Sequence, residues 1–547
     1  MTLRYNMNQN KLQNISELID YNFDKKKNGL ALINLANSEE RYTYTQFKDE
    51  VEKVAKILIG IGVKKTDRCA IFSFNCPKWV IVDLAIQKLG AVSVPLYWRS
   101  TPNEIEYIVN LVNPKVIFFG DMALARVFQS LKTKTQLHSV LFSEEKEKGT
   151  LNWSSFCSLK GIDNVERVSE NDLARIVFTS GSTGAPKGVM LTHKNLIYEA
   201  FALSKGFKIN PSDIFLSYLP LNHMFGLAGE VYTPILAGAE INFSNDPKAA
   251  IGYLSQVKPT IFLSVPFVLE KVCKNSLQKL SFLGLEEKLM QLTERRPPFA
   301  YNWLLNYVGK KIKQKFGGQI RCLIVGGAHL SRDVEIFFKH TNIPLYQGYG
   351  MTEAAPVIAV NTPGHSKIFS VGNPFDKIKI SKDGEILVKG ENVMSGYFKD
   401  ETKTLEVLQH GWLHTGDLGK VDHYGHLFIY ERKDDLIVLS TGKNINPLPI
   451  EEKLEELFGI FKAVVYGNKK PYLVAVLFVS GNINVDYEKK VVKHLQLINA
   501  YLPHYERVVK YKLLSAKDLE GSKSLKVSRK KIINEQREVL EQLYLQN

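Results

Sequence analysis

The chain has 547 residues, 45% of them hydrophobic and 23% charged, which is the composition of a globular protein with two or more domains. Its 71 basic residues against 56 acidic residues give a formal net charge of +15, which favours anionic partners such as nucleotides, coenzyme A or an anionic membrane. Because no stripe of Lys and Arg is interleaved with aromatic residues, we expect no nucleic-acid binding.

The cysteines and the N-terminal segment add two further exclusions. The five cysteines are scattered and contain no CxxC pair, which argues against a disulfide framework and against a zinc site. The N-terminal residues are polar and lack the apolar segment of a signal peptide, and no apolar run reaches the about 20 residues that span a bilayer. The sequence predicts a cytoplasmic protein, with peripheral membrane contact left open.

From Tyr42 onward, segments with helical period alternate with short apolar runs. The period predicts helices over Gln46–Ile61 and Trp79–Lys88. Short strands are predicted at Cys69–Phe74, Ala91–Leu96, Val116–Phe119, Ile214–Tyr218, Thr260–Ser264 and Arg321–Val325. Alternation of this kind is typical of parallel sheets flanked by helices, so we predict a large α/β domain built from several subdomains.

The pattern changes after Asp383, where the short strands EILVKG and HLFIYE predict a β-rich section. A compact α+β stretch follows, with a helix over Ile450–Phe458 and strands across AVVYG and LVAVLFV. We therefore predict a large N-terminal domain over residues 1–433 and a small C-terminal domain over residues 434–547, with the boundary near Asp434.

The segment FTSGSTGAPKGVMLTH, residues 178–193, directly follows an apolar run that predicts a strand. Its hydroxyl groups can donate to phosphate oxygens, and its glycines let backbone N–H groups come close to them. The spacing is not that of a Walker A loop, and a plain Ser/Gly-rich surface loop is the alternative. We predict a phosphate-binding loop made by Thr179, Ser180, Gly181, Ser182, Thr183, Gly184 and Lys187.

This segment resembles the phosphate loop of the adenylate-forming enzymes, a family that includes acyl-CoA synthetases, luciferases and the adenylation domains of peptide synthetases. The resemblance runs from about Tyr42 to about Ile532 and is carried by several motifs in the family's order. It implies an enzyme that uses ATP, Mg²⁺ and coenzyme A. Residues 1–433 would then be the AMP-binding domain for ATP and the acyl substrate, and the C-terminal domain would rotate between two half-reactions.

The second motif is YQGYGMTE, residues 346–353, placed after a short strand-like stretch. The resemblance gives Tyr349 the stacking of adenine, Thr352 a hydroxyl near the α-phosphate, and Glu353 the carboxylate that binds Mg²⁺. Taken alone, this motif is equally typical of a solvated turn. The preceding segment VGGAHL resembles the lining of the adenine pocket and places Gly327 there, although the family usually has Pro where this chain has His329.

Two further motifs are GWLHTGDLG and YERKDDLIVLSTGKNINPLPIE. By resemblance, Asp417 accepts both ribose hydroxyls and Arg432 contacts ribose and phosphate. Asp434 is the predicted hinge, and Gly442 lets the pantetheine arm of coenzyme A pass. Glu431 departs from the family, which usually has Gly or Asp before this arginine.

The last motif is SKSLKVSRKKI, in which Lys526 matches the family's lysine that reaches the phosphates during adenylation. Its neighbours Lys523, Lys530 and Lys531 form a basic run, and basic runs are usually solvated faces. Lys526 is therefore predicted as catalytic on the motif and not on its charge.

The sequence predicts the identity of the carboxylic acid substrate less closely than it predicts the reaction. The segment LPLNHMFGLAGE resembles long-chain synthetases, as do KFGGQIRCLIVGG and NAYLPHYERV, and His223 aligns with a histidine near the substrate carboxylate. A core or helix-capping histidine is the alternative for His223. The small residues that follow can open a tunnel for an acyl chain or serve close helix packing, so chain length is not readable and aryl acids stay open.

The expected reaction is ATP-dependent adenylation of a carboxylic acid, most simply a long-chain fatty acid, to acyl-AMP and pyrophosphate, followed by acyl transfer to coenzyme A. The alternatives are an acyl-AMP ligase or a synthetase that delivers to acyl carrier protein, and an aryl-CoA ligase. A non-catalytic nucleotide- or lipid-binding protein with the same fold is the remaining alternative. The sequence does not predict an oligomeric state.

Overall fold

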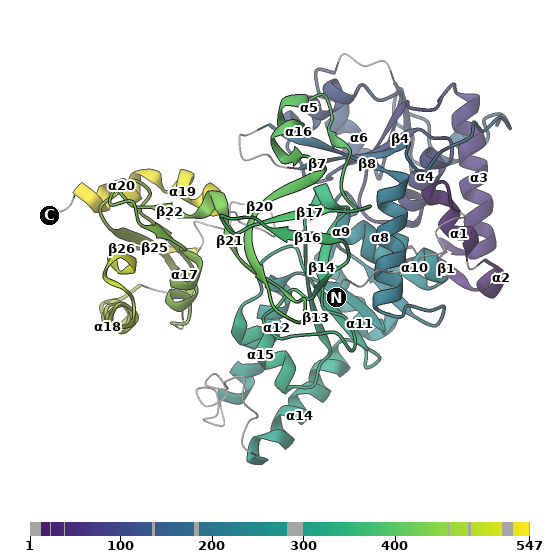
Figure 1. The fold of residues 1–547 in the computed structure, drawn as a ribbon. Helices are drawn as coiled ribbons and strands as arrows, with labels where there is room; N and C mark the ends of the chain where they lie inside the picture. The colour runs from purple at the N-terminus through teal and green to yellow at the C-terminus, as the bar shows by residue number, and fades with distance from the viewer. Residues whose placement is uncertain are drawn as a thin grey trace. The chain divides into compact units, whose positions relative to one another are not determined.

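The structure is a computed structural model that describes residues 12–21, 23–37, 39–133, 137–179, 185–281, 299–457, 459–479, 483–516 and 529–545. The chain forms two compact units, both visible in Figure 1. Unit 1 consists of Met1–Lys379, Leu387–His414 and Val421–Phe428, and unit 2 consists of Ile380–Ile386, Thr415–Lys420 and Ile429–Asn547. Among the helices described, none has both the length and the hydropathy needed to cross a membrane.

Unit 1 contains a seven-stranded sheet in the order β18-β8-β7-β4-β3-β5-β6. Neighbours among β3 to β7 are parallel, whereas β7 and β8 form an antiparallel pair. The strands are β3 (Arg68–Phe72), β4 (Val92–Leu96), β5 (Val116–Phe119), β6 (His138–Leu141), β7 (Leu173–Thr179), β8 (Lys187–Thr192) and β18 (Gly396–Tyr397). Its helices include α3 (Tyr44–Gly60), α4 (Pro77–Lys88), α5 (Pro102–Val112), α6 (Met122–Gln129) and α7 (Trp153–Cys157).

A nine-stranded sheet in the order β15-β14-β13-β12-β11-β9-β10-β1-β2 is the second sheet of unit 1. In this order, the neighbouring strands from β13 to β1 are parallel. The pairs β15-β14, β14-β13 and β1-β2 at the two edges are antiparallel. The strands are β1 (Leu30–Asn34), β2 (Arg41–Thr43), β9 (Ile214–Ser217), β10 (Glu240–Phe243), β11 (Ile261–Ser264), β12 (Cys322–Val325), β13 (Leu345–Gly350), β14 (Val357–Val360) and β15 (Asn373–Pro374). The predicted α/β class with largely parallel sheets is confirmed.

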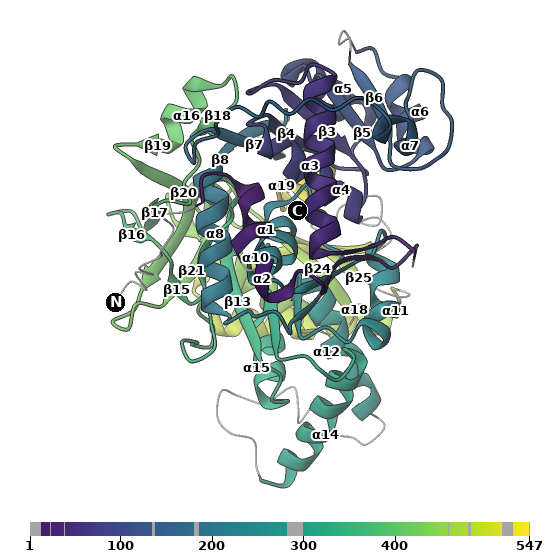
Figure 2. The ribbon, with the colours of Figure 1, turned by 90° about the vertical axis from the view of Figure 1, so that its right-hand side faces the viewer.

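The remaining helices of unit 1 connect or cover these strands, as Figure 2 shows from the second direction. They are η1 (Ile15–Glu17), α1 (Leu18–Tyr21), α2 (Phe23–Lys26), α8 (His193–Gly206), α9 (Met224–Leu227), η2 (Ala228–Tyr232), α10 (Thr233–Ala237), α11 (Pro247–Val257), α12 (Pro266–Ser281), α14 (Phe299–Lys315), α15 (Arg332–His340), η3 (Thr352–Ala354) and α16 (Glu401–Val407). Helix α4 is apolar almost all round because it contacts β3 and β4 of one sheet and β1 of the other.

The ends of the predicted elements lie within a few residues of the observed ones. The helix predicted over Gln46–Ile61 begins at Tyr44, because Thr43 and Gln46 form a capping box there. The helix predicted over Ile450–Phe458 runs over Leu448–Glu455, where Asn446 accepts from the backbone N–H of Leu448. The strands at Val116–Phe119 and over residues 322–325 agree with prediction, since their apolar side chains are buried on both faces.

A fully buried ion pair links helix α4 to strand β7. The guanidinium of Arg175 donates to the Asp83 carboxylate and to the Tyr232 hydroxyl, and neither Arg175 nor Asp83 has any exposed side-chain area. Tyr232 and Ser93 also donate to Asp83, at 2.7 and 2.6 Å. Asp83 therefore organises a polar network inside an otherwise apolar layer.

Unit 2 is built on a three-stranded sheet in the order β24-β25-β26, with β24 (Ile460–Tyr466), β25 (Leu473–Val479) and β26 (Val508–Ser515). Alternate residues of β25 belong to two different apolar clusters, because α17 (Leu448–Glu455) and α18 (Val485–Tyr501) cover one face and α19 (Arg529–Glu535) and α20 (Arg537–Leu545) cover the other. The predicted α+β character of this region is confirmed. Shorter elements are η4 (Lys433–Asp435), β22 (Ile437–Val438), β23 (Asn444–Ile445) and η5 (His504–Glu506).

Residues 377–432 form the β-rich section that the sequence predicts. Its strands are β16 (Lys377–Ile380), β17 (Glu385–Lys389), β19 (Leu408–Gln409), β20 (Trp412–Val421) and β21 (Leu427–Arg432). Both units take residues from this section. The hinge near Asp434 and the division into residues 1–433 and 434–547 remain predictions.

One buried carboxyl makes the stability of unit 1 depend on pH. Burial raises the pKa of Glu335 on α15 from 4.5 to about 7, although the backbone N–H of Phe369 donates to the carboxylate at 3.0 Å. The folded state thus holds this proton more tightly than the unfolded chain does. Its contribution to the free energy of unfolding is fully present below pH 4.5 and is lost as the pH rises through about 7.

We expect Glu335→Gln to flatten that part of the stability profile and to stabilise the protein by on the order of 2 kcal/mol above pH 7. Urea unfolding at a series of pH values measures this, and the difference between wild type and variant isolates Glu335 from other titrating groups. Glu401→Gln, at an exposed position, is the control. A difference that is the same at pH 5 and pH 8 would contradict the prediction.

Candidate active site

The predicted phosphate loop connects two paired strands. Strand β7 ends at Thr179 and β8 begins at Lys187, and these two residues are the last antiparallel pair of the ladder. The pairing places Thr179 and Lys187 directly opposite each other at the end of the two strands. The predicted residues Ser180, Gly181, Ser182, Thr183 and Gly184 lie outside the described residues.

The motif YQGYGMTE lies differently from the prediction, which placed it after a strand. Strand β13 itself runs through Gly350, because it pairs with β12 on one side and with β14 on the other. A side chain at Gly350 would place its Cβ 1.8 Å from the Pro356 carbonyl oxygen, so only glycine fits this close approach. Tyr349 is therefore on the strand, and Thr352 and Glu353 begin the short helix η3 that follows.

Glu353 is held by a residue that the sequence analysis did not identify. The hydroxyl of Tyr397, on the short strand β18, donates to Glu353 Oε1 at 2.8 Å. Lys187 Nζ lies 5.7 Å from the centroid of the same Tyr397 ring, and the electrostatic field of Glu353 acts on it. Tyr397 thus connects the predicted metal-binding carboxylate to the end of the phosphate loop. No sequence pattern marks Tyr397, because only the pairing of β18 with β8 brings it there.

The carboxylate suits Mg²⁺ when the ion arrives with a nucleotide. In the part of the chain that the structure describes, no group of three or more His, Cys, Asp or Glu residues forms a metal cage. Mg²⁺ is usually held by one or two carboxylates together with substrate phosphates and water. Glu353, oriented by Tyr397 and beside Lys187, fits a Mg²⁺–triphosphate complex and does not fit a dedicated protein metal site.

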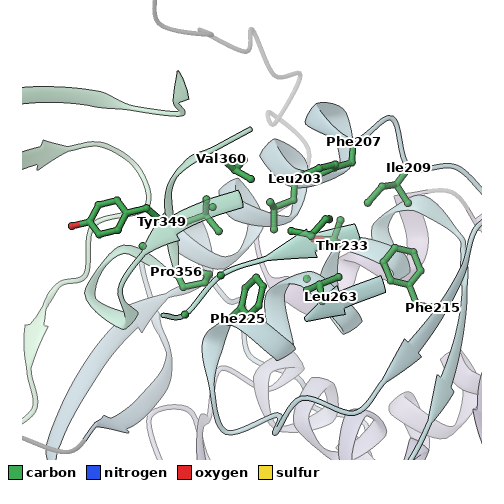
Figure 3. Close-up of a pocket in the computed structure, with 17 residues that line it drawn as sticks. Leu203, Phe207, Ile209, Phe215, Phe225, Thr233, Leu263, Tyr349, Pro356 and Val360 are labelled. Atoms are coloured by element: carbon green, nitrogen blue, oxygen red, sulfur yellow. The ribbon is translucent and has the colours of Figure 1, made fainter. Parts of the chain in front are cut away.

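An apolar pocket begins beside the predicted adenine-binding residues. It holds about 600 Å³ of space between atoms, including the part open to solvent. Its lining combines backbone at Gly326, Gly327, Gly348 and Gly350 with the side chains of Leu203, Phe207, Ile209, Phe215, Phe225, Thr233, Leu263, Ile324, Tyr349, Pro356, Val357 and Val360. In Figure 3, Tyr349 lies at one side of this set, and Phe207, Ile209 and Phe215 lie at the opposite side.

The glycines keep this pocket open. Gly327 has φ +82, which a side chain rarely adopts, and a Cβ at Gly229 would lie 2.3 Å from Leu263. Gly229 belongs to the π-helix η2, a form that is often found at functional sites. Of the small residues after His223, Gly229 lines the apolar pocket, and both Gly229 and Gly226 pack closely, against Leu263 and Leu219.

His223 is the residue before helix α9, two positions before Phe225 of the pocket. Its ring lies 5.7 Å from the ring of Tyr97, and its side chain makes no capping hydrogen bond to the helix. His223 therefore occupies the N-cap position of α9 without a side-chain capping bond, and its exposure contradicts the alternative of a core histidine. Its predicted place near the substrate carboxylate stays a prediction.

In unit 2, the structure brings together the two predicted ribose-binding residues. Arg432 Nε lies 3.3 Å from the Asp417 carboxylate, and its Nη2 donates to the Thr415 carbonyl at 3.3 Å. The carboxylate oxygen Oδ2 of Asp434 lies 3.3 Å from Lys530 Nζ. Gly442 has φ +77, and a Cβ at this position would meet no atom within 4 Å.

The basic run near the C-terminus is partly occupied by structural contacts. Arg529 pairs with Glu451 at 2.9 Å, Lys530 with Asp434 at 3.3 Å and Lys531 with Glu535 at 3.7 Å. Lys526 and Lys523 lie outside the described residues.

The five cysteines are free thiols, four of them buried, and burial raises the pKa of each. Such thiols are poor nucleophiles.

The fold and these motifs define an ATP-using, adenylate-forming enzyme. The family model described as AMP-binding enzyme matches residues 19–398, and the model of the AMP-binding enzyme C-terminal domain matches residues 434–547. The chain belongs to this family, so the resemblance drawn from its motifs is confirmed. Acyl-CoA ligases of this family use ATP, Mg²⁺ and coenzyme A.

Among curated proteins, the long-chain-fatty-acid–CoA ligase FadD15 of Mycobacterium bovis is 30% identical over 470 residues, which cover 80% of this chain and 77% of that protein. The long-chain-fatty-acid–CoA ligase ACSBG2 of Rattus norvegicus is 31% identical over 483 residues, covering 80% and 72%. Long chain acyl-CoA synthetase 3 of Arabidopsis thaliana is 31% identical over 488 residues, covering 80% and 73%.

Solved structures share the fold at lower identity. The anthranilate CoA ligase AuaEII in complex with anthranoyl-AMP superposes with a TM-score of 0.79 at 19% identity and covers 99% of this chain and 100% of its own. ATP-bound MatB from Rhodopseudomonas palustris superposes with a TM-score of 0.72 at 21% identity, covering 92% and 95%.

Proposed function

We propose that this protein is an ATP-dependent long-chain fatty acid–CoA ligase. The acid carboxylate attacks the α-phosphorus of ATP, and pyrophosphate leaves to give acyl-AMP. The thiol of coenzyme A then attacks the acyl carbonyl, its proton passes to solvent, and AMP leaves. Because the transferred group is a phosphoryl ester, the protein acts mainly by positioning and electrostatic stabilisation.

The observation that carries the proposal is the apolar pocket that starts at the adenine-binding motif. Its lining is shared by Gly327 and Tyr349, which the motifs assign to the nucleotide, and by aliphatic and aromatic side chains as far as Phe215. An acid with its carboxylate beside Tyr349 would lay its hydrocarbon chain along these side chains. A buried methylene gains about 0.8 kcal/mol, so such a lining favours long alkyl chains.

In unit 1, we assign the β- and γ-phosphates to Thr179, Lys187 and the loop between them, and Mg²⁺ to Glu353. When bound, Mg²⁺ would neutralise phosphate charge as pyrophosphate leaves. Thr352 would contact the α-phosphate, and His223 the substrate carboxylate. The contact of Tyr397 with both Glu353 and Lys187 supports this assignment.

In unit 2, we assign the ribose hydroxyls to Asp417 and Arg432, which already contact each other. Lys526 would approach the α-phosphate during adenylation, and rotation about Asp434 would replace it with the glycine at 442 for the thiol step. Lys530 and Lys531 have ion-pair partners, which is consistent with the motif's assignment of this role to Lys526.

The test is pyrophosphate release by the full chain with ATP, Mg²⁺ and acids of graded chain length, each with and without coenzyme A. We expect release that rises with chain length and a thioester that forms with coenzyme A. Benzoates as the preferred acids would indicate an aryl-CoA ligase. A thioester formed only with acyl carrier protein would change the acceptor, and no release with any acid would contradict the proposal.

We expect Tyr397→Phe to raise the Mg²⁺ concentration for half-maximal activity about 10-fold, because the hydroxyl that orients Glu353 is lost. Pyrophosphate release at a series of Mg²⁺ concentrations measures this. Tyr424→Phe is the matched control, since Tyr424 is 65% exposed and its ring contacts the ring of His423. An unchanged Mg²⁺ requirement in Tyr397→Phe would contradict the assignment of Glu353.

We expect Leu203→Phe to shorten the usable chain, because Leu203 lines the pocket from helix α8. Activity with the longest accepted acid should fall about 10-fold or more while shorter acids are unaffected, since one methylene in such a pocket changes specificity by about that factor. Leu203→Met keeps the side-chain volume and should keep the wild-type profile. An equal loss with all acids would indicate that the pocket does not hold the chain.

A further inference from the structure

Helix α14 (Phe299–Lys315) carries an exposed face that no part of the adenylation chemistry uses. Trp303 is 70% exposed and Tyr307 is 54% exposed. Lys310, Lys311 and Lys315 are exposed as well. These positions repeat at three- and four-residue spacing, so they share one side of the helix. We name these five residues the α14 face.

The opposite side fixes the orientation of the helix. Leu304, Leu305, Val308 and Ile312 are buried, so α14 packs on unit 1 through a continuous apolar stripe. A Cβ at Gly309 would lie 2.0 Å from the Thr341 carbonyl oxygen, which shows how closely the helix approaches the end of α15. The α14 face is therefore held outward by packing.

A hydrogen bond and the position of the helix support the same conclusion. Asn342 Nδ2 donates to Asn306 Oδ1 at 2.7 Å and ties α14 to the residues after α15. In Figures 1 and 2, α14 is the outermost helix at its end of unit 1.

The face is strongly cationic. Helix α14 has the sequence FAYNWLLNYVGKKIKQK, with four lysines and no acidic residue, in a chain whose net charge is +15. Lys311 Nζ lies 5.5 Å from the centroid of the Tyr307 ring. The two aromatic side chains occupy the first half of the face and the lysines occupy the second half.

We propose that the α14 face binds the surface of an anionic lipid membrane. Trp and Tyr are suited to the boundary between headgroups and acyl chains, because each has an apolar body and a polar tip. Lysines can bury their methylenes along the same boundary and keep the ammonium at lipid phosphates. A helix that has an exposed aromatic end and a lysine cluster lies in the plane of such a surface.

The aromatic side chains distinguish this partner from nucleic acid. Proteins that bind single strands present aromatic rings within a cationic groove that follows the backbone. On α14, the exposed rings of Trp303 and Tyr307 and the exposed lysines are separated along the helix. An acidic protein partner would match the lysines, yet it would leave Trp303 without a matching apolar surface.

The test uses sedimentation of the full chain with phosphatidylcholine vesicles that contain phosphatidylglycerol, and with vesicles of phosphatidylcholine alone. We expect binding to the anionic vesicles only, weakening as salt is raised. Lys310→Gln with Lys311→Gln should bind about 30-fold more weakly, as follows for two lysines at an anionic surface. Trp303→Ser with Tyr307→Ser should lose the binding that remains at high salt.

Matched controls carry the same chemical changes on another exposed helix. They are Lys489→Gln with Lys490→Gln, and Tyr501→Ser, all on α18. They should bind vesicles like the wild type, and thermal unfolding should show that every variant is folded. Vesicle binding should also shift tryptophan emission to the blue, and Trp303→Phe should remove that shift.

Three results would overturn the proposal. The first is equal vesicle binding by wild type and both α14 variants, and the second is an equal loss in the α18 controls. The third is binding to duplex DNA, or self-association without vesicles, that the α14 substitutions abolish while vesicle binding is absent. None of these results depends on whether the protein activates fatty acids, because the readout contains no substrate.

Discussion

Lys526→Ala is expected to abolish formation of acyl-AMP and largely to spare thioester formation from supplied acyl-AMP. Negative charge spreads over the phosphoryl oxygens as pyrophosphate leaves, and the lysine ammonium is the assigned donor to that charge. Removing such a group costs on the order of 3 kcal/mol, which corresponds to a loss of about 100-fold in rate. On this assignment the thiol step does not need the lysine, because AMP is the leaving group there and the proposed domain rotation would withdraw the ammonium.

The two half-reactions are measured separately, as pyrophosphate release with acid and ATP, and as acyl-CoA formation from synthetic acyl-AMP. Lys530→Ala and Lys531→Ala are the matched controls, since these lysines have ion-pair partners within unit 2. Both controls should keep adenylation within a few-fold of wild type. Equal loss of both half-reactions in Lys526→Ala would contradict its role and would move the assignment to another cation of the segment.

Asp83→Ala is expected to destabilise unit 1 by about 3–5 kcal/mol, because it leaves the Arg175 guanidinium buried without its counter-ion. Arg175 and Asp83 are both inaccessible to solvent, and Tyr232, Ser93 and Gln87 also donate to the lost carboxylate. The free energy of unfolding in urea, followed by tryptophan fluorescence, measures the loss.

The double variant Asp83→Ala with Arg175→Met separates the cost of the orphaned charge from the cost of the lost volume. We expect it to be more stable than Asp83→Ala alone, since removing both members of a buried pair is far less costly than removing one. If the losses of unfolding free energy in Asp83→Ala and in Arg175→Met simply added up in the double variant, the orphaned charge would not explain the cost of Asp83→Ala. Lys56→Ala, which removes an exposed pair with Asp163, should change stability by less than about 1 kcal/mol.

The network around Asp83 is also connected to the apolar pocket of unit 1. Tyr232 closes the π-helix η2, and Gly229 of the same short helix lines the pocket. The buried pair therefore anchors the segment that lines this pocket at Gly229. Hydrophobic residues in place of a buried ion pair are often as stable as the pair. We therefore attribute the polar network in this apolar layer to its position beside the pocket.

The fold class and the family of the protein could be predicted before any coordinates were known. Apolar runs such as 116–119 and 322–325 predict buried parallel strands, because a strand covered on both faces needs apolar side chains at every position. The phosphate loop and the motif around Glu353 predict nucleotide chemistry, because hydroxyls, glycines and a carboxylate are adjacent in the chain. Local patterns of this kind are readable without coordinates.

The tertiary structure alone decided which distant residues meet. Tyr397 reaches Glu353 only because β18 pairs with β8, and Asp83 reaches Arg175 only because α4 lies against β7. The motif through Gly350 was predicted to follow a strand, whereas strand β13 runs through it, since Gly350 is required by the neighbouring backbone at Pro356 and not by a local bend. Pairings between segments far apart in the chain depend on packing of the whole unit, and local sequence periodicity carries no information about them.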